Sequence, residues 1–541
     1  MVVKTDATGV ALLTPQEMAQ ADQATIAAGT EGIVLMERAA SAVAEKALTH
    51  WPFAKRIALL AGPGNNGGDA FAAASILARN DREVVVYHLS PIEKLSGDAA
   101  KAAGAYHGRT EPLEAFSPAD HDLVVDGLFG AGLGRPLEGG VADTVDKLNA
   151  SATPVLAIDL PSGIAGATGR MMGTAITANA TVTFFRRKPG HLLEPGRSHC
   201  GEVTVTDIGI AADVLAAIEP ANFANEPLLW LERLSFPTDA GHKYDRGHAV
   251  VFSGSASKTG AARMAAMAAL RGGAGLVTIF SPASAVLVNA AHLTAVMLRA
   301  CDSAEDLGQC LEDKRFNAFV LGPGFGVGEG ARRTVEAVLA ADRRLVLDAD
   351  GITSFAEDPD ALFALASDGA VDDAKLVLTP HEGEFKRLFP DLTANDELCK
   401  LDRARQAAAR ARAIVVLKGR DTVIAAPDGR AAINATGTPW LATAGTGDVL
   451  TGLIAAQLAQ GTPSFEAACA GVWMHGKAAE AFGPGLIAED LPSMLPRVHA
   501  EIASLRLALR RRPCSGSAFS PSAAAPAAPS PRAARVVFPS G

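Results

Sequence analysis

Short apolar runs alternate with longer alanine-rich stretches through the first part of the chain. The runs are Ile57–Ala61, Glu83–His88, Leu123–Val125, Val155–Ile158 and Val182–Phe185. Runs that are apolar at nearly every position, rather than at alternate positions, are typical of parallel strands buried on both faces. The pattern predicts a first α/β unit, preceded by helical structure over Thr14–Ala47 with Thr14 as the N-cap.

A second series of apolar runs follows a break at Leu215–His242, where three prolines fall and no clear period remains. Its runs are His248–Phe252, Leu276–Phe280, Phe319–Leu321, Leu345–Leu347, Leu376–Leu378 and Ile414–Leu417. The strongest helical stretches between and after them are Gly260–Arg271 and Asp448–Gln460. The sequence therefore predicts an α/β protein of two three-layer αβα domains, over residues 12–222 and 228–510.

The end of the chain has a different composition. Residues 513–541 contain six prolines, many alanines and serines, and no acidic residue. Such a segment lacks the apolar side chains needed to offset the entropy of ordering the chain. We expect residues 511–541 to form a disordered tail.

The composition of the chain excludes several classes of protein. Of 541 residues, 48% are hydrophobic and 20% are charged, which is enough apolar material for packed cores. The net charge of −10 argues against a general nucleic-acid or anionic-membrane binder. The six cysteines form no CxxC pair, so neither a zinc site nor a disulfide framework is predicted. The start of the chain lacks a basic stretch followed by a long apolar core, and no run of 18 apolar residues occurs. We therefore expect no secretory signal, no transmembrane helix and a cytoplasmic location.

A glycine-rich loop follows the first apolar run. Residues 60–69 read Leu-Ala-Gly-Pro-Gly-Asn-Asn-Gly-Gly-Asp and contain a GxGxxG pattern, with Glu83 at about the distance of a ribose-binding acid. That pattern alone is compatible with a dehydrogenase or with a turn selected only for folding. The polar side chains of Asn65, Asn66 and Asp69 stand where a pyrophosphate would need small residues. They favour binding of a cation or a hydroxyl group instead.

Two later strand-end loops add oxygen ligands to this edge of the predicted sheet. They are Asp126–Arg135 and Ala157–Gly163, and ligands of α/β sheets bind where strands end. Asn66, Asp126 and Ser162 offer hard oxygen donors, which suit an alkali or alkaline-earth cation rather than zinc. Asp159 is a candidate acid or base, and the alternative is that it only caps the turn that follows it.

The second domain carries a glycine loop, Ala442–Gly452, which opens an apolar helix. Backbone N–H groups at such a helix start form an anion hole. Asp448 lies there and is placed to take a proton from a hydroxyl group that attacks phosphorus. Aspartate is also common in the first turn of helices, so the whole loop is more informative than Asp448 alone.

Three more strand-end loops complete the second candidate site. Lys418–Thr422 supplies two cations and a hydroxyl for a nucleotide. In Thr379–Glu384, His381 is a candidate hydrogen-bond partner for the substrate or a structural histidine, and Glu382 and Glu384 are candidate Mg²⁺ ligands. Gly322–Gly326 permits close backbone contact with a ligand.

Residues 12–215 resemble the YjeF-type NAD(P)H-hydrate epimerase domain, which is Rossmann-like, through the three loops named above for the first domain. The resemblance implies that R and S hydrates of the nicotinamide cofactor are interconverted at C6, with Asp159 as the proton-transfer residue. It implies a potassium site at Asn66, Asp126 and Ser162. The hydrate-binding residues it implies are Asn65, Asn66, Gly67, Gly68, Asp69, Gly130, Ala131, Gly132, Leu133, Gly134, Arg135, Pro136 and Asp159.

Residues 240–505 resemble the ribokinase-like superfamily and, within it, the ADP/ATP-dependent NAD(P)H-hydrate dehydratases. The resemblance implies that Mg²⁺ and ADP or ATP, with ADP expected, phosphorylate the hydrate hydroxyl, and that phosphate then leaves to give NAD(P)H. Asp448 is the implied base. The implied hydrate-binding residues are Ala261, Gly324, His381 and Asp448, and the implied nucleotide-binding residues are Lys418, Gly419, Arg420, Asp421, Thr422 and Gly447.

Two other functions remain open at this stage. The second domain alone is compatible with a ribokinase-like small-molecule kinase fused to a non-catalytic YjeF binding domain. YjeF-type domains also occur in mRNA-decapping scaffolds, so the first domain is compatible with a binding or dimerisation module. The expected partners are the hydrates NADHX and NADPHX with ADP or ATP, and neither nucleic acid nor a membrane. A homo-oligomer is expected from the resemblance.

Overall fold

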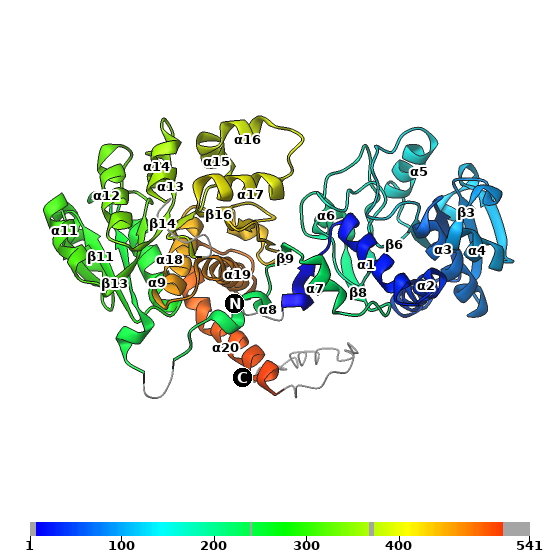
Figure 1. Ribbon diagram of the computed structural model, residues 1–541, viewed down its shortest axis with the longest axis horizontal. Coiled ribbons are helices and arrows are strands. Elements are labelled where there is room, and N and C mark those ends of the chain that lie inside the picture. The colour runs from blue at the N-terminus through cyan, green and yellow to red at the C-terminus, as the bar shows by residue number, and fades with distance from the viewer. Residues whose placement is uncertain (1–6, 238–240, 367–372, 512–541) are drawn as a thin grey trace, which may run out of the picture.

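The computed structural model describes residues 7–237, 241–366 and 373–511, which fold around two β-sheets (Figure 1). The predicted tail, apart from Arg511, lies outside the described residues. Within the described ranges no helix combines the length and the apolarity needed to cross a membrane, and all five cysteines there are free thiols. The predicted α/β class with two sheet-based units is confirmed, whereas the exact domain limits stay a prediction.

The first sheet has seven parallel strands in the order β4-β3-β2-β5-β6-β7-β8. They are β2 (Arg56–Ala61), β3 (Glu83–His88), β4 (Arg109–Pro112), β5 (Leu123–Gly127), β6 (Val155–Ile158), β7 (Ala180–Phe184) and β8 (Glu202–Thr206). Five of these match the predicted apolar runs. The two edge strands, β4 and β8, escaped prediction because they are half-exposed and carry no apolar run.

Both faces of this sheet are buried, as the apolar runs predict. Ile57 and Leu59 pack into one hydrophobic cluster, while Ala58 and Leu60 pack into another on the opposite face. The covering helices include α1 (Pro15–Ala27), α2 (Gly32–His50), α3 (Asn65–Arg79), α4 (Gly97–Ala105) and α5 (Gly140–Asn149). Thr14 caps α1 in a capping box, as predicted.

The second sheet has eleven strands in the order β1-β9-β18-β17-β16-β15-β14-β13-β10-β11-β12. Its parallel part is β10 (His248–Phe252), β11 (Leu276–Ser281), β12 (Met297–Ala300), β13 (Phe316–Leu321), β14 (Arg344–Leu347), β15 (Leu376–Leu378) and β16 (Ile414–Leu417). The strands β17 (Val423–Ala425) and β18 (Ala431–Ile433) extend it by antiparallel pairing. Its central helix, α18 (Thr446–Ala459), is buried from Val449 to Ala459 and packs against α9 (Gly260–Arg271) and α19 (Ser464–Phe482).

The first unit is attached to the second sheet at both of its ends. The strand β1 (Ala11–Leu12) pairs with β9 (Asn222–Ala224), and β9 pairs with β18. The chain therefore enters and leaves the seven-stranded unit through neighbouring strands of the other sheet. The sequence pattern did not predict this pairing, because two- and three-residue strands are too short to show a period.

The order in which successive strands are added changes sides once in the parallel part of each sheet. In the first sheet this switch lies between β2 and β5, and in the second between β10 and β13. At such a switch the connecting loops diverge to opposite faces and leave a crevice beyond the carboxyl ends of the strands. The first candidate site lies beside the crevice of the first sheet, and Gly324 of the second candidate site lies beside the crevice of the second sheet.

We predict that the close approach of α18 to α9 depends on a glycine. A Cβ atom at Gly452 would lie 2.1 Å from the carbonyl oxygen of Ala265, so Gly452→Ala forces the two helices apart. The free energy of unfolding should fall by about 2 kcal/mol or more, measured by urea unfolding followed through tryptophan fluorescence. Gly308→Ala, in the exposed helix α11 (Ala304–Glu312) where a Cβ meets nothing within 4 Å, is the matched control and should not destabilise the protein. Equal midpoints for the two variants would contradict the prediction.

Candidate functional site

The first candidate site begins at the glycine-rich loop between β2 and α3. A Cβ atom at Gly62 would lie 1.7 Å from the Leu128 carbonyl oxygen, and one at Gly67 would lie 1.9 Å from the Gly62 carbonyl oxygen. These two glycines are therefore required for the loop to pack on itself. A Cβ at Gly64 would meet nothing within 4 Å. Folding accounts for Gly62 and Gly67, so the chemistry of this loop lies in its polar side chains.

Asp126 and Ser162 form a buried polar pair beside this loop. The Ser162 backbone N–H donates to Asp126 Oδ2 at 2.7 Å, and the Ser162 hydroxyl donates to Asp126 Oδ1 at 2.6 Å. Burial raises the pKa of Asp126 to about 6, although the hydrogen bonds from Ser162 oppose the rise. Among the described residues Asp126 has no ion-pair partner, and the buried Asn66 Nδ2 has no hydrogen-bond partner.

The potassium prediction fits this chemistry. A buried carboxyl with several oxygen neighbours and no cation is costly unless a positive charge reaches it, and K⁺ prefers such oxygen donors. A Cβ atom at Gly130 would lie 3.1 Å from both Asn66 Oδ1 and Asp159 Oδ2, so the Asn66 amide oxygen lies near Gly130 and Asp159. In the described part of the chain no three His, Cys, Asp or Glu side chains cluster as a transition-metal site would require.

Asp159 follows β6 with a φ of +64°, in the left-handed region that non-glycine residues rarely adopt. Its Oδ2 accepts a hydrogen bond from the Ala131 N–H at 3.0 Å, and its Oδ1 accepts one from the Thr183 hydroxyl at 3.0 Å. The carboxylate thus joins the loop after β5 to strand β7 instead of capping its own turn. A strained backbone held in place by distant contacts is typical of functional positions.

Lys188 sets the charge of Asp159. The Lys188 side chain is only 2% exposed, and its Nζ donates to Asp159 Oδ1 at 2.5 Å and to the Thr183 hydroxyl at 2.9 Å. Burial alone would raise the pKa of Asp159, but the Lys188 ammonium and its hydrogen bond outweigh burial and lower that pKa to about 2. Asp159 is therefore ionised at neutral pH.

His191 holds the same segment in place. Its Nδ1 accepts from the Lys188 backbone N–H at 2.9 Å, so its Nε2 carries the proton that is donated to the Asp159 carbonyl oxygen at 2.8 Å. Burial and the Lys188 charge lower the pKa of His191 to about 4, which keeps the ring neutral. Sequence reasoning missed Lys188, His191 and Thr183. The signal available was the Lys-Pro-Gly-His stretch directly after a predicted strand.

Two further carboxyl groups face this pair. Burial, followed by the charges of Asp159 and Asp22, raises the pKa of Asp69 well above its usual value. Burial also raises the pKa of the half-buried Asp22, on α1, to about 6, against the attraction of Lys188. Both carboxyl groups are buried, but only Asp159 has an ammonium partner, so the pKa of Asp69 lies well above its usual value while the pKa of Asp159 lies below it. Pairs whose pKa values are separated in this way can divide acid and base roles.

The remaining predicted residues of the first site line its rim. Asn65 begins α3 and is exposed, while Gly67 and Gly68 are buried in its first turn. In the loop at 130–136, Gly130 and Ala131 lie against Asp159, and Leu133 is half-buried against the hydrophobic cluster on one face of the sheet. The exposed residues of this loop are Gly132, Gly134, Arg135 and Pro136.

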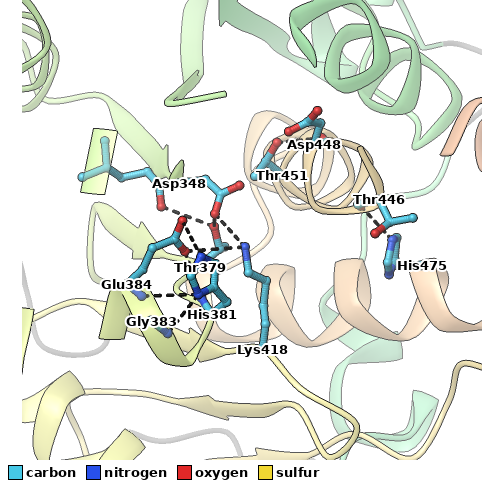
Figure 2. A network of polar contacts seen from close by, with 11 residues as sticks. Asp348, Thr379, His381, Gly383, Glu384, Lys418, Thr446, Asp448, Thr451 and His475 are labelled. Carbon is cyan, nitrogen blue, oxygen red and sulfur yellow. Dashed lines mark hydrogen bonds and ion pairs between the residues drawn. The ribbon is translucent and has the colours of Figure 1, made fainter. Parts of the chain in front are cut away.

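The second candidate site gathers at the carboxyl ends of β14, β15 and β16 (Figure 2). Asp348, directly after β14, accepts hydrogen bonds on Oδ1 from Lys418 Nζ at 2.8 Å and from the Thr379 hydroxyl at 2.9 Å. Lys418 Nζ also lies 4.0 Å from Glu384 Oε2. Burial raises the pKa of Glu384, while the Lys418 charge opposes the rise. Sequence reasoning missed Asp348, although an aspartate after the predicted strand at Leu345–Leu347 was a usable signal.

His381 caps the helix α15 (Glu382–Leu388). Its Nδ1 accepts the N–H groups of Gly383 at 2.9 Å and Glu384 at 3.3 Å, and Glu384 Oε2 accepts the His381 N–H at 2.9 Å. The structural role considered for His381 is therefore present. Its side chain is still 57% exposed, so one edge of the ring faces outward.

Asp448 lies on the first turn of α18 near the Asp348–Lys418 pair (Figure 2). Burial, and then the charge of Asp348, raise its pKa to about 7, while Lys418 opposes the rise. A Cβ atom at Gly447 would lie 3.6 Å from Lys418 Nζ. The structure thus brings the predicted residues Gly447, Asp448 and Lys418 together at the start of this helix.

Other predicted residues lie around this centre or turn away from it. Gly324, with φ +70°, lies at the switch between β10 and β13, and Ala261 lies on the first turn of α9. Gly419 and Thr422 hydrogen-bond to each other within their loop. Asp421 and Arg420 turn toward the first unit. Glu382 pairs with Arg403 through two hydrogen bonds of 3.0 Å, away from Asp348.

Comparison with known proteins covers both sites. A family model described as YjeF-related protein N-terminus matches residues 32–190, and one described as NAD(P)H-hydrate dehydratase matches residues 249–497. The first segment contains the Asp159–Lys188 pair and the second contains the Asp348–Lys418 pair.

The chain is also similar to two bifunctional NAD(P)H-hydrate repair enzymes. It is 35% identical to that of Thermofilum pendens over 498 residues, covering 87% of this chain and 92% of the relative. It is 35% identical to that of Moorella thermoacetica over 522 residues, covering 90% and 96%. A solved structure of ADP/ATP-dependent NAD(P)H-hydrate dehydratase from Bacillus subtilis, co-crystallised with ATP/Mg²⁺, is 28% identical with a TM-score of 0.42, covering 50% of this chain and 96% of that chain.

We predict that Lys188→Met raises the pKa of Asp159 from about 2 to above the ordinary value of 3.8, because burial then acts without the compensating ammonium. Carbon NMR of the Asp159 carboxyl during an acid titration measures this directly. Lys46→Met, which removes the exposed partner of Glu202, is the control and should leave Asp159 unchanged. An Asp159 titration that stays near pH 2 in Lys188→Met would refute the assignment.

Proposed function

This chain belongs to the bifunctional NAD(P)H-hydrate repair enzymes, and from that membership we propose which activity each of its two units carries. The first unit interconverts the R and S hydrates of NADH or NADPH. The second unit dehydrates the S hydrate to the reduced cofactor at the expense of ADP or ATP. Together the two activities repair both epimers, because epimerisation supplies the only form that dehydration consumes.

In the first unit we propose that Asp159 transfers the proton. Inversion at C6 requires a base and an acid beside the nicotinamide ring. Lys188 lowers the pKa of Asp159 and burial raises that of Asp69, so Asp159 is the proposed base and Asp69 the proposed acid. Asn66, Asp126 and Ser162 would hold K⁺, whose charge would compensate the buried Asp126 and order the adjoining loop.

In the second unit we propose that Asp448 is the base for phosphoryl transfer. The hydrate hydroxyl attacks the terminal phosphorus of the nucleotide, Asp448 accepts the hydroxyl proton, and the N–H groups at the start of α18 stabilise the charge on the phosphoryl oxygens. Phosphate then leaves C6 with the C–O bonding electrons, and loss of a proton from C5 restores the ring double bond. Hydroxide would be a far poorer leaving group.

Lys418 and the carboxyl groups beside it organise the nucleotide in this proposal. Lys418 neutralises a phosphate, and Asp348 and Glu384 supply oxygen ligands that suit Mg²⁺. The observation that carries the dehydratase proposal is the position of Asp448, with a pKa of about 7, beside Gly447 and Lys418 at a helix start. A base with a pKa near the working pH is the efficient choice for proton transfer.

The alternative is a small-molecule kinase joined to a non-catalytic binding unit. A kinase would accumulate a stable phosphorylated product, whereas the dehydratase regenerates the absorbance of reduced nicotinamide. The buried Lys188–Asp159 pair and the strained backbone at Asp159 favour a catalytic first unit. Incubating an R/S hydrate mixture with ADP or ATP and Mg²⁺ separates the two functions.

We predict complementary defects for the two aspartates in that assay. Asp159→Asn should consume only the S hydrate, because it lowers epimerisation by about 10²-fold or more while dehydration continues. Asp448→Asn should interconvert the hydrates without regenerating the reduced cofactor. Chromatographic separation of the epimers over time gives both rates. If Asp159→Asn still consumes both hydrates at the wild-type rate, the epimerase assignment is wrong.

We also predict a pH dependence for dehydration. Because the base works when ionised, kcat/KM should rise as the pH increases through about 7, the pKa of Asp448. Asp348→Asn removes a like charge that raises this pKa, so the rise should move to lower pH. The profile is measured with the S hydrate and subsaturating nucleotide. A shift toward higher pH in Asp348→Asn would contradict the role given to Asp448.

A further inference from the structure

One segment of the first unit contacts both candidate sites. It runs from Lys188 to Arg197, between β7 and β8. Lys188 and His191 hold Asp159 through the contacts described above. A few residues later, Glu194 and Arg197 reach across to the second unit. This Lys188–Arg197 segment is therefore a direct physical connection between the two units.

The segment is bonded to the loop that the proposed function gives to the nucleotide. Arg197 Nη1 donates to the Arg420 carbonyl oxygen at 3.2 Å, and Arg197 Nη2 donates to the Ala435 carbonyl oxygen at 2.7 Å. The Glu194 backbone N–H donates to Asp421 Oδ2 at 2.9 Å. Two residues of the Lys418–Thr422 loop are thus fixed by groups from the first unit.

Asp421 holds the Lys418–Thr422 loop to the Lys188–Arg197 segment. Its Oδ1 accepts a hydrogen bond from Lys400 Nζ at 2.6 Å, while its Oδ2 is held by Glu194, and the residue is only 7% exposed. Both carboxylate oxygens therefore have protein partners. Removing one partner of a buried, fully paired carboxylate is strongly unfavourable, so Asp421 fixes the loop to the first unit.

Apolar contacts keep the segment from sliding. Leu192 and Leu193 are buried in the same hydrophobic cluster as the core of the second unit. The pairing of β1 with β9 ties the first unit to that sheet from the other side. The segment is therefore seated in a fixed position.

A cavity of about 530 Å³ opens where the two units meet. Arg170 and Glu194 line it from the first unit, and Lys418 and Gly419 line it from the second. Its volume is in the range of small-molecule sites. The Lys418–Thr422 loop thus borders the interface along one side, while Lys418 Nζ reaches Asp348 on the other.

We propose that Arg197 and the Glu194 backbone N–H are positioning residues for the Lys418–Thr422 loop, so that the first unit completes the nucleotide site of the second. This rests on the proposed function only in that the loop binds ADP or ATP. Lys418 lies three residues from Asp421, so a loop released at Asp421 or Arg420 no longer holds Lys418 at one distance from Asp348 and Gly447. The consequence is weaker nucleotide binding with little change in the chemical step.

The test compares Arg197→Ala, Arg197→Lys and the control Arg82→Ala in the full chain. Arg82 also donates to a backbone carbonyl, that of Pro52, but within the first unit at the amino end of β3. Arg197→Ala should raise the KM for ADP about three- to tenfold with less than a twofold change in kcat. Arg197→Lys, which can keep one of the two hydrogen bonds, should lie between, and Arg82→Ala should match the wild type. An unchanged KM in Arg197→Ala, or the same rise in Arg82→Ala, overturns the inference.

Two further measurements separate this inference from the proposed function. If Lys418→Met leaves the KM for ADP unchanged, the assignment of the loop to the nucleotide fails. If Lys418→Met raises that KM and Arg197→Ala does not, only the positioning role fails. Hydrogen exchange of the wild type needs no variant: ADP should slow exchange at the Glu194 amide, because linkage makes the contact reciprocal. Exchange unaffected by saturating ADP overturns the positioning role.

Discussion

In each unit of this protein, a single lysine lies among buried carboxyl groups and lowers the pKa of a neighbouring one. In the first unit, burial raises the pKa of every nearby carboxyl group, and only the one bonded to Lys188 is driven the other way. In the second unit, burial and then the charge of Asp348 raise the pKa of Asp448 to about 7, and Lys418 opposes that rise. Each lysine therefore lowers the pKa of a neighbouring carboxyl group that burial alone would raise further. Acid–base chemistry at neutral pH uses carboxyl groups whose pKa values are separated in this way.

The parallel sheets make these lysine sites possible. Their strands are buried on both faces, so polar side chains concentrate where the strands end and the chain turns. Asp126 lies near the end of β5 and Asp159 follows the neighbouring strand β6, while Asp348 and Lys418 follow strands of the other sheet. The sites are consequently dry enough for charges to interact strongly, which is why single ammonium groups have such large effects on the pKa values.

The two units are joined more closely than a linker between tandem domains would require. The first unit leaves and re-enters the second sheet through β1 and β9, and its Lys188–Arg197 segment is seated on the other unit's core and loop. Arginine-to-carbonyl bonds and a buried Asp421 are directional contacts, so they fix the orientation of the units. A chain that performs two successive steps on one substrate thereby holds both sites in one framework.

The local hydrophobic pattern was sufficient to predict most of the strands and the positions of the main loops. Eleven apolar runs all became strands, the helix at Gly260–Arg271 has the predicted limits, and the loops holding Asp126, Asp159, Lys418 and Asp448 lie at the predicted sheet edges. These features depend on residues close together in the sequence, where the hydrophobic period, the helix caps and the glycine-rich loops can be recognised. Short or half-exposed strands such as β1, β4 and β9 carry no such period and were missed.

Only the tertiary structure decided which side chains pair at the two sites and which carboxyl groups are ionised. Lys188 and Asp159 are 29 residues apart, and Lys418 and Asp348 are 70 apart, so no local pattern connects them. The same holds for Arg197 and the loop it supports, which are separated by more than two hundred residues. The residue types at the sites are a property of the sequence. Which carboxyl is ionised depends on burial and on a cation brought from far along the chain, and folding alone determines both.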